Sequence, residues 1–185
     1  MHQHDNFHII TGGPGSGKTS LINALAARGY RTAEESGRAI IRAQQTIGGK
    51  AFHTGDRALY AELMLSHALV DYTRFTADPS PVFFDRGAPE LVGYFPLVGL
   101  PTPPHFREAA RVYRYAPVVF VAPPWPEIYV NDAERKQDFA EAIASYDLAV
   151  ATYRETGYAV AELPKASMAE RVAFVLERVG LNAGG

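Results

Sequence analysis

The sequence predicts an α/β protein in which a parallel sheet of about five strands lies between layers of helices. Short apolar runs alternate with longer segments of helical periodicity along the chain, which is the pattern of strands joined by crossover helices. A glycine-rich loop, residues 12–19, stands between the first apolar run and the first helical one. The 185 residues are 47% apolar and 21% charged, so we expect residues 1–185 to form one domain.

The glycine-rich loop reads Gly12-Gly13-Pro14-Gly15-Ser16-Gly17-Lys18-Thr19, and Ser20 follows it. It matches the pattern G-x-x-x-x-G-K-[ST] at every fixed position and has the strand and helix that this motif requires on either side. Glycines let backbone N–H groups turn toward phosphate oxygens, and the positive end of the following helix strengthens this anion site. Lys18 can reach the β- and γ-phosphates, and the Thr19 hydroxyl can bind Mg²⁺. The loop therefore predicts a nucleoside triphosphate site, with ATP and Mg²⁺ as the expected cofactors.

The first half of the chain continues the alternation of strands and helices. Arg28-Gly29 gives a basic last turn and a glycine stop, so the helix after the loop should end near Ala27. Apolar residues spaced by three and four mark a longer helix, which Thr54 or Asp56 would cap. The strands predicted in this half are 7–11 and 30–35, and the later helices are 39–45 and 59–71.

The second half predicts three more strands. Residues 82–85 are apolar up to a final aspartate, which indicates a central strand. Residues 91–100 are apolar too, but their glycines and proline permit no assignment. The remaining expected strands are 117–122 and 158–163, and the expected helices are 101–113, a helix that ends near Arg154, and 168–179.

Polar residues follow several of the predicted strands. Ligands of parallel sheets bind at the carboxyl ends of the strands, so these residues should gather beside the glycine-rich loop. Asp85 ends an apolar strand, as an acidic residue that binds Mg²⁺ in a phosphoryl-transfer site would, and it could also act as a base. The alternative is a structural role, in an ion pair with Arg86 or as a helix cap. Arg86 itself could hold an acceptor or a phosphate, or it could form a structural ion pair with Asp85 or Glu35.

Glu34 and Glu35 end the second predicted strand, and one of them could accept a proton from an acceptor hydroxyl. Alternation along a strand lets only one of the two face the site. We favour Glu35, which is nearer the strand tip, although a charge that complements a helix N-terminus would also explain the pair. Arg38 is a partner for this carboxylate or a phosphate ligand.

Arg135 lies in a polar segment that follows the fourth predicted strand. An arginine in a lid, here about residues 123–138, could close over the triphosphate and neutralise charge in the transition state. A solvated helix face in which neighbouring charges pair locally is an equally good interpretation. Arg107, Arg111 and Arg114 share one face of a predicted helix and are interpreted mainly as solvated charges.

Composition and charge exclude several function classes. A net charge of −2 gives no electrostatic basis for a nucleic-acid partner or an anionic membrane. There is no cysteine, no secretory h-region and no apolar run of about 20 residues, so a cytoplasmic protein without a membrane partner is expected. His2 and His4 are interpreted as part of a frayed, solvated terminus. The sequence does not specify an oligomeric state.

Several motifs together resemble a known family. They are the phosphate loop, Glu-Glu-Ser-Gly-Arg at 34–38, Phe-Phe-Asp-Arg-Gly at 83–87, Pro-Pro-Trp-Pro-Glu-Ile-Tyr at 123–129 and Asp-Ala-Glu-Arg at 132–135. They are similar to the AAA-type predicted ATPases related to the kinase domain of the bifunctional NAD-biosynthesis regulator, a ribosylnicotinamide kinase. The resemblance implies a three-layer P-loop NTPase fold of the nucleoside- and nucleotide-kinase kind.

The same resemblance implies roles for individual residues. Lys18 and Thr19 would bind phosphate and Mg²⁺, Asp85 would be associated with the metal, and Arg135 would belong to the lid. It does not imply an acceptor, and it covers the kinase half of the bifunctional protein alone, because nothing in this sequence resembles a nucleotidylyltransferase domain. The Asn-Lys-x-Asp guanine signature is missing too, which favours ATP over GTP.

Two functions of different classes follow. The first is a phosphotransferase that moves the γ-phosphate of MgATP to a small-molecule hydroxyl, or an ATPase, with Glu35 or Asp85 orienting the acceptor and Lys18, Arg135 and Mg²⁺ stabilising the migrating charge. The second is a regulatory switch that binds a nucleoside triphosphate, hydrolyses it slowly and acts on a protein or lipid partner. Its best support is the apolar segment 91–100, a candidate docking patch.

Overall fold

The computed structural model describes residues 2–129 and 139–181. Its main sheet has five strands in the order β3-β4-β2-β6-β7, and every neighbouring pair is parallel, which confirms the predicted α/β fold. The strand that enters the phosphate loop, β2, is at the centre, between the strand that ends in Asp85 and β6. The five strands are β2 (Phe7–Gly12), β3 (Arg31–Ala33), β4 (Val82–Asp85), β6 (Val118–Ala122) and β7 (Ala159–Glu162).

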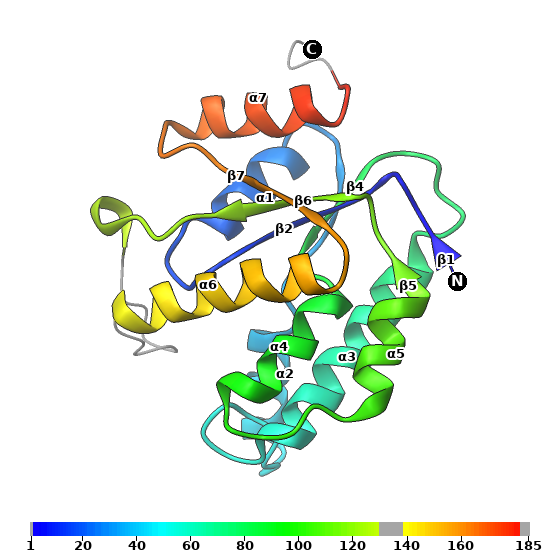
Figure 1. Cartoon of the computed structure of the whole chain (residues 1–185), viewed down its shortest axis with the longest axis vertical. Helices are drawn as coiled ribbons and strands as arrows, with labels where there is room; N and C mark the ends of the chain where they lie inside the picture. Colours follow the sequence, from blue (N-terminus) through cyan, green and yellow to red (C-terminus); the bar gives the residue numbers. More distant parts are fainter. Residues whose placement is uncertain (1, 130–138, 182–185) are drawn as a thin grey trace.

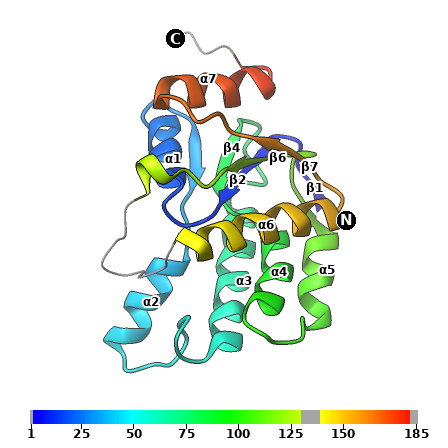
Figure 2. The same ribbon diagram turned by 60° about the vertical axis from the view of Figure 1, so that its left-hand side comes forward.

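Helices cover both faces of this sheet, so the architecture has three layers (Figure 1). Two helices, α1 and α7, pack together on one face, and α6 crosses the other. Four further helices, α2 to α5, extend side by side away from that second face (Figure 2). The α-helices are α1 (Lys18–Ala26), α2 (Gly37–Thr46), α3 (Arg57–Arg74), α4 (Leu91–Leu97), α5 (Pro104–Val112), α6 (Phe139–Glu155) and α7 (Met168–Arg178), and the 3₁₀-helices are η1 (Ala88–Glu90) and η2 (Pro126–Ile128).

Apolar side chains on the central strands alternate between two cores. Ile9 and Phe84 belong to the core on the α6 side, whereas Ile10 and Phe83 belong to the core under α1 and α7. Successive side chains of a strand point to opposite faces, so both faces of a central strand must be apolar. This is why β4 has no polar residue before Asp85, and why that carboxylate is the first polar group at the strand's end.

The segment 91–100, which the sequence left unassigned, begins with α4 despite its proline and glycine. Gly93 permits this packing: a Cβ at this position would lie 2.2 Å from Thr152 Oγ1 on α6. The long helix α3 is capped by Asp56 and not by Thr54, because the Asp56 carboxylate accepts the Leu59 N–H at 2.9 Å. Both details depend on contacts that helical periodicity does not encode.

The interpretation of the N-terminus as frayed is wrong. Strand β1 (His2–Gln3) pairs in parallel with β5 (Tyr113–Arg114), a small second sheet that the sequence did not predict. The His4 ring stacks on Phe7 at 4.5 Å between centroids. None of the helices in the described part of the chain is long and apolar enough to cross a bilayer.

Candidate functional site

The phosphate loop connects β2 directly to α1. Gly12 has φ 139°, and a Cβ there would lie 2.4 Å from the Ala122 carbonyl oxygen of β6, so only glycine fits beside the neighbouring strand. Gly17 has φ 80° and immediately precedes α1, whose first N–H groups point into the loop. The loop thus has the positive-φ glycines and the helix N-terminus of an anion cradle.

Lys18 and Ser16 both form hydrogen bonds with the backbone of the loop itself. The Lys18 ammonium donates to the Gly13 carbonyl at 2.7 Å, and the Ser16 hydroxyl donates to the same oxygen at 2.8 Å. The pKa of Lys18 is lowered to about 8, chiefly by burial and also by the nearby Arg86 charge, whereas the charges of Asp85 and Glu35 oppose the shift. A buried ammonium with one neutral acceptor is well placed to bind an anion. Thr19 and Ser20 are exposed on the first turn of α1.

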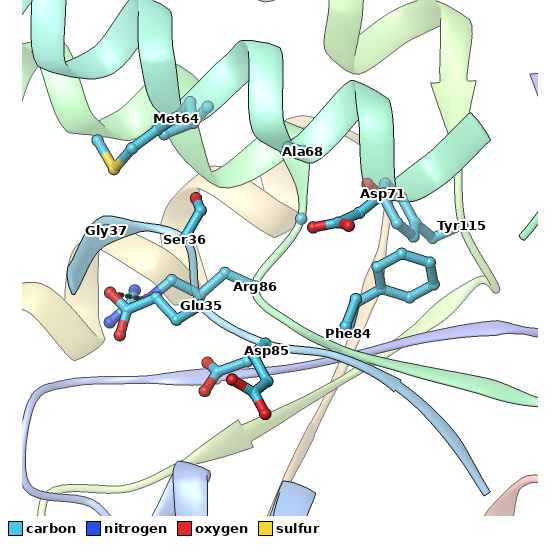
Figure 3. Close-up of a pocket in the computed structure, with 14 residues that line it drawn as sticks. Glu35, Ser36, Gly37, Met64, Ala68, Asp71, Phe84, Asp85, Arg86 and Tyr115 are labelled. Atoms are coloured by element: carbon cyan, nitrogen blue, oxygen red, sulfur yellow. Dashed lines mark ion pairs between the residues drawn. The ribbon is translucent and has the colours of Figure 1, made fainter. Parts of the chain in front are cut away.

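The carboxyl ends of β3 and β4 bring Glu35, Asp85 and Arg86 together beside the loop. Figure 3 shows these three side chains facing one cavity, with the β4 end below and the α3 helix above. Asp85 is 7% exposed, and its Oδ1 has no hydrogen-bond partner among the residues that the structure describes. Burial raises the pKa of Asp85 to about 6, the Lys18 charge lowers it, and the Glu35 charge raises it. A buried carboxylate oxygen without a partner can accept a proton or bind a cation.

Arg86 has a left-handed backbone, with φ 73°, which is uncommon for a residue with a side chain. Its N–H donates to the Ile10 carbonyl at 3.0 Å, so β2 holds this turn. Its Nη2 donates to the Gly12 carbonyl at 3.2 Å, and its Nε lies 3.6 Å from Glu35 Oε1. Strained backbone of this kind is concentrated at functional sites, where the surrounding contacts maintain it.

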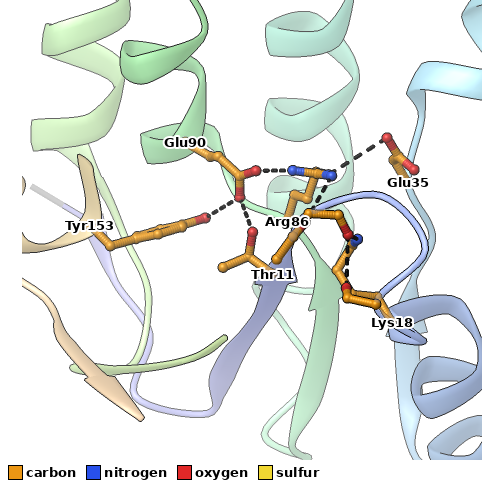
Figure 4. A network of polar contacts seen from close by, with 9 residues as sticks. Thr11, Lys18, Glu35, Arg86, Glu90 and Tyr153 are labelled. Carbon is orange, nitrogen blue, oxygen red and sulfur yellow. Dashed lines mark hydrogen bonds and ion pairs between the residues drawn. The ribbon is translucent and has the colours of Figure 1, made fainter. Parts of the chain in front are cut away.

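Glu90 completes the arrangement, and the sequence analysis did not identify it. Its carboxylate pairs with the Arg86 guanidinium and accepts hydrogen bonds from the Thr11 hydroxyl at 2.5 Å and the Tyr153 hydroxyl at 3.1 Å (Figure 4). The spacing of four between Arg86 and Glu90 is the one available sequence signal, and it is weak because such pairs are common on protein surfaces. Arg86 pairs with Glu35, one of the two partners expected for it, and with Glu90 in place of the other, Asp85.

The other predicted residues have different positions. Glu34 is exposed, whereas Glu35 is half-buried beside Arg86. Arg38 is half-buried on the first turn of α2 and is not among the residues that line the cavities described here. Arg135, with the segment 130–138 of the predicted lid, lies outside the described residues.

A larger cavity of about 170 Å³ adjoins the loop and is called the acceptor cavity below. Its polar end has Pro14 of the loop, Glu35, Arg86 and Glu90. Its other end is mostly apolar and lies among α3, α4 and α6. That end is lined by Tyr60, Met64, Leu91, Gly93, Tyr94, Leu97, Ser145 and Leu148, with His53 and Gly87 also at the wall. The Tyr94 hydroxyl is buried there, and no described residue forms a hydrogen bond with it.

The opposite side of the loop is closed by Arg171 of α7, which is 1% exposed. Its two terminal nitrogens donate to the Ser16 carbonyl at 3.2 and 3.1 Å, while its Nε is buried with no hydrogen-bond acceptor in the described part of the chain. Burial lowers the pKa of Arg171 below its usual value. Tyr129, the residue after η2, also lies close to the loop. A Cβ at Gly15 would lie 2.6 Å from its ring.

These residues fit ATP and Mg²⁺ in their donor chemistry. The loop offers backbone N–H groups and the Lys18 ammonium to phosphate oxygens, and the orphaned Asp85 oxygen offers an acidic ligand beside them. The described residues contain no group of three or more acidic or histidine side chains arranged to hold a metal ion. A magnesium ion would therefore use Thr19, Asp85 and the phosphates of the nucleotide itself.

Comparison with known proteins agrees with this fold. The chain matches the family described as AAA domain over residues 7–171, and no curated protein matches it. It is similar to NadR protein in complex with NR, with a TM-score of 0.68 and 21% identity over 95% of this chain and 52% of that one. It is also similar to NadR protein in complex with NAD and AMP-PNP, with a TM-score of 0.67 and 20% identity over 95% of this chain and 50% of that one.

A third similar structure is shikimate kinase from Acinetobacter baumannii in complex with shikimate. The TM-score is 0.56 and the identity 16%, over 94% of this chain and 92% of that one. The chain spans about half the length of the NadR chains that it matches. These likenesses show the fold, which is that of P-loop kinases, as the sequence motifs predicted. Because the family match extends over most of its length, this chain belongs to the AAA domain family.

Proposed function

We propose that this protein is an ATP-dependent small-molecule kinase, in which residues 1–185 act as one domain. The observation that carries the proposal is the acceptor cavity, which opens onto Pro14 of the phosphate loop at the same end where Glu35 and Arg86 lie. A cavity that is polar beside the loop and apolar at its far end suits a small molecule that presents a hydroxyl to the γ-phosphate. Of the similar solved structures, one is a shikimate kinase and another holds AMP-PNP, which supports this assignment.

The phosphate loop would bind the triphosphate with its backbone N–H groups. Lys18 now donates to its own loop at Gly13, and it would exchange that carbonyl for phosphate oxygens. Mg²⁺, when bound, would neutralise charge on the β- and γ-phosphates. Arg86 lies beside Gly12 and would stabilise charge that develops on the transferred group or hold the acceptor.

Glu35 is our choice for the base. It lines the acceptor cavity, whereas Asp85 lines only the smaller cavity beside it. In the proposed reaction the acceptor oxygen forms a bond to the γ-phosphorus, the bond from that phosphorus to the β-phosphate oxygen breaks, and the hydroxyl proton passes to the Glu35 carboxylate. Asp85 would hold the metal, directly or through water.

The regulatory switch has less structural support. The apolar segment on which it depended forms α4, which buries Val92 and Phe95 and turns Leu91 and Tyr94 toward the acceptor cavity. Leu97 and Leu100 remain 49% and 37% exposed. Scattered exposed leucines are normal on a protein surface and do not by themselves define a docking patch.

The deciding experiment is transfer of label from γ-labelled ATP, with Mg²⁺, to a pool of nucleosides, sugars and other hydroxylated metabolites. We expect a labelled small molecule, which disappears with Lys18→Ala. Glu35→Gln should lower transfer far more than it lowers binding of AMP-PNP. Slow phosphate release with no labelled product would reject the kinase and favour an ATPase or a switch, and full transfer by Glu35→Gln would remove Glu35 as the base.

A further inference from the structure

Glu90 lies outside the phosphate loop, yet its contacts connect the main parts of the site. One carboxylate oxygen pairs with the Arg86 guanidinium. The other accepts the Thr11 hydroxyl at 2.5 Å and the Tyr153 hydroxyl at 3.1 Å. Figure 4 shows the carboxylate between these groups, with the phosphate loop and Lys18 on the far side of Arg86. The side chain is 13% exposed, so solvent contributes little to holding it.

The partners of Glu90 come from separate elements. Thr11 is the penultimate residue of β2 and directly precedes Gly12, the first residue of the phosphate loop. Tyr153 is fully buried near the end of α6. Arg86 follows β4. A carboxylate that accepts from two fixed, buried hydroxyls has its own orientation fixed, so it can in turn fix the guanidinium that it binds.

The remaining contacts of Arg86 restrain its guanidinium less. Its bond to the Gly12 carbonyl is 3.2 Å long, and its Nε lies 3.6 Å from the Glu35 carboxylate, beyond hydrogen-bond distance. Its backbone has φ 73°, a conformation that the side-chain contacts must help to maintain. Glu90 therefore supplies the closest charged contact of Arg86 among the described residues.

We propose that Glu90 is a positioning residue that acts through Arg86. It holds the guanidinium at the junction of Gly12, Glu35 and the acceptor cavity, where the proposed phosphoryl transfer, on which this inference rests, would take place. Without the Glu90 charge, the Arg86 guanidinium can move away from Gly12 and closer to Glu35, with which it already pairs at 3.6 Å. A closer cation would lower the pKa of the Glu35 carboxylate and weaken it as a base, and the guanidinium would no longer lie where the transferred group needs it.

The kinetic test is a double-mutant cycle of Glu90→Gln and Arg86→Gln, with phosphoryl transfer from MgATP as the readout. Glutamine keeps the size of Glu90 and an oxygen for Thr11 and Tyr153, but it loses the charge. We expect Glu90→Gln to lower kcat on the order of 10- to 100-fold, the usual cost of misplacing a supporting group, and to change the melting temperature little. In the Arg86→Gln background, Glu90→Gln should lower kcat less than about 2-fold, because the guanidinium that Glu90 positions is absent.

Two variants serve as matched controls. Tyr153→Phe and Thr11→Val each remove one hydrogen bond from the same carboxylate but leave its charge opposite Arg86. We expect each to lower kcat less than Glu90→Gln does. If the effects of Glu90→Gln and Arg86→Gln multiply, or if kcat and melting temperature fall together in all four variants, Glu90 is a structural residue and the proposal is wrong.

A spectroscopic test is independent of catalysis and of how well Arg86→Gln folds. The Nε–H signal of Arg86 in a ¹⁵N spectrum can be assigned by its absence in Arg86→Lys. The buried Arg86 Nε should give a protected signal that moves or broadens in Glu90→Gln. An unchanged signal overturns the positioning role. If the unaltered protein transfers no phosphate but this signal responds, the proposed function has failed and the positioning role has not.

Discussion

The two sides of the phosphate loop each present an arginine to the loop backbone, half-buried Arg86 on one side and buried Arg171 on the other, and the two arginines differ in their surroundings. At the front, Arg86 donates to the Gly12 carbonyl and lies against the carboxylates of Glu35 and Glu90. At the back, Arg171 donates to the Ser16 carbonyl and forms no ion pair with a described residue. The carboxylates raise the pKa of Arg86 above its usual value, whereas burial lowers the pKa of Arg171.

This difference indicates separate roles for the charges of Arg86 and Arg171. The front arginine balances acids that the proposed chemistry uses, so its charge is already compensated before any ligand binds. The back arginine is buried at a cost in solvation that only a backbone carbonyl offsets. An anion on the loop would reduce that cost, and we therefore interpret Arg171 as part of the field that favours phosphate.

The largest effect should come from removing the front cation. Arg86→Met takes the nearest positive charge from the half-buried carboxylates of Glu35 and Glu90, and we expect the free energy of unfolding to fall by about 3 kcal/mol, the lower end of the cost of breaking a buried pair. Urea denaturation at pH 7.5 measures it. Arg107→Met is the control, because the Arg107–Glu155 pair is exposed and should contribute about 0–1 kcal/mol. Similar losses in both variants would show that the front charges do not depend on Arg86.

Asp85→Asn should raise the free energy of unfolding, whereas Arg86→Met should lower it. The folded-state pKa of Asp85 is about 6, above its usual 3.8, so between these values the native state binds a proton that the unfolded state has released. Stability therefore falls as pH rises through about 4 to 6, and the ionised carboxylate costs about 2–3 kcal/mol above pH 6. The ligand-free variant should be more stable than the parent at pH 8 by that amount and equal to it at pH 4. Equal stability at both pH values would show that Asp85 is not strained by burial.

The sequence predicted the parts of the site that local pattern determines. The phosphate loop depends on glycines and a lysine within eight consecutive residues, and Glu35, Asp85 and Arg86 follow predictable strand ends. The parallel sheet follows from the same alternation of strands and helices. These predictions needed only local periodicity and the rule that parallel strands end at one edge.

The residues that hold the site in place were not predictable in this way. Glu90 meets Thr11 across 79 residues, and Arg171 meets Ser16 across 155. An isolated glutamate after a strand, or an arginine in a helix with an otherwise apolar face, is indistinguishable in the sequence from a surface charge. The tertiary packing that buries each of them determines its role, as it also determines the pairing of β1 with β5.

A smaller gain should follow from Tyr94→Phe at the acceptor cavity. The Tyr94 hydroxyl is buried and has no hydrogen-bond partner within residues 2–129 and 139–181, so its removal relieves an unpaired polar group. We expect the ligand-free protein to gain about 1 kcal/mol of stability. Tyr153→Phe is the matched control and should lose about 1 kcal/mol, because its hydroxyl donates to Glu90. Thermal and urea unfolding measure both. A loss in both variants would mean that the Tyr94 hydroxyl has a partner in solution.

The smallest change in stability should come from Arg171→Met, which tests the back of the loop. Methionine retains much of the packing volume and removes a buried charge, while the Ser16 carbonyl loses its donor, so these opposing terms should leave stability within about 1 kcal/mol of the parent. Binding of MgAMP-PNP, measured by calorimetry, should nevertheless weaken roughly 5- to 10-fold, because a positive charge near the phosphates is lost. The comparison of the two arginines would be wrong if Arg171→Met destabilised the protein as much as Arg86→Met does and left MgAMP-PNP binding unchanged. Arg171 would then be a purely structural residue, and the field behind the loop would come from the N-terminus of α1 alone.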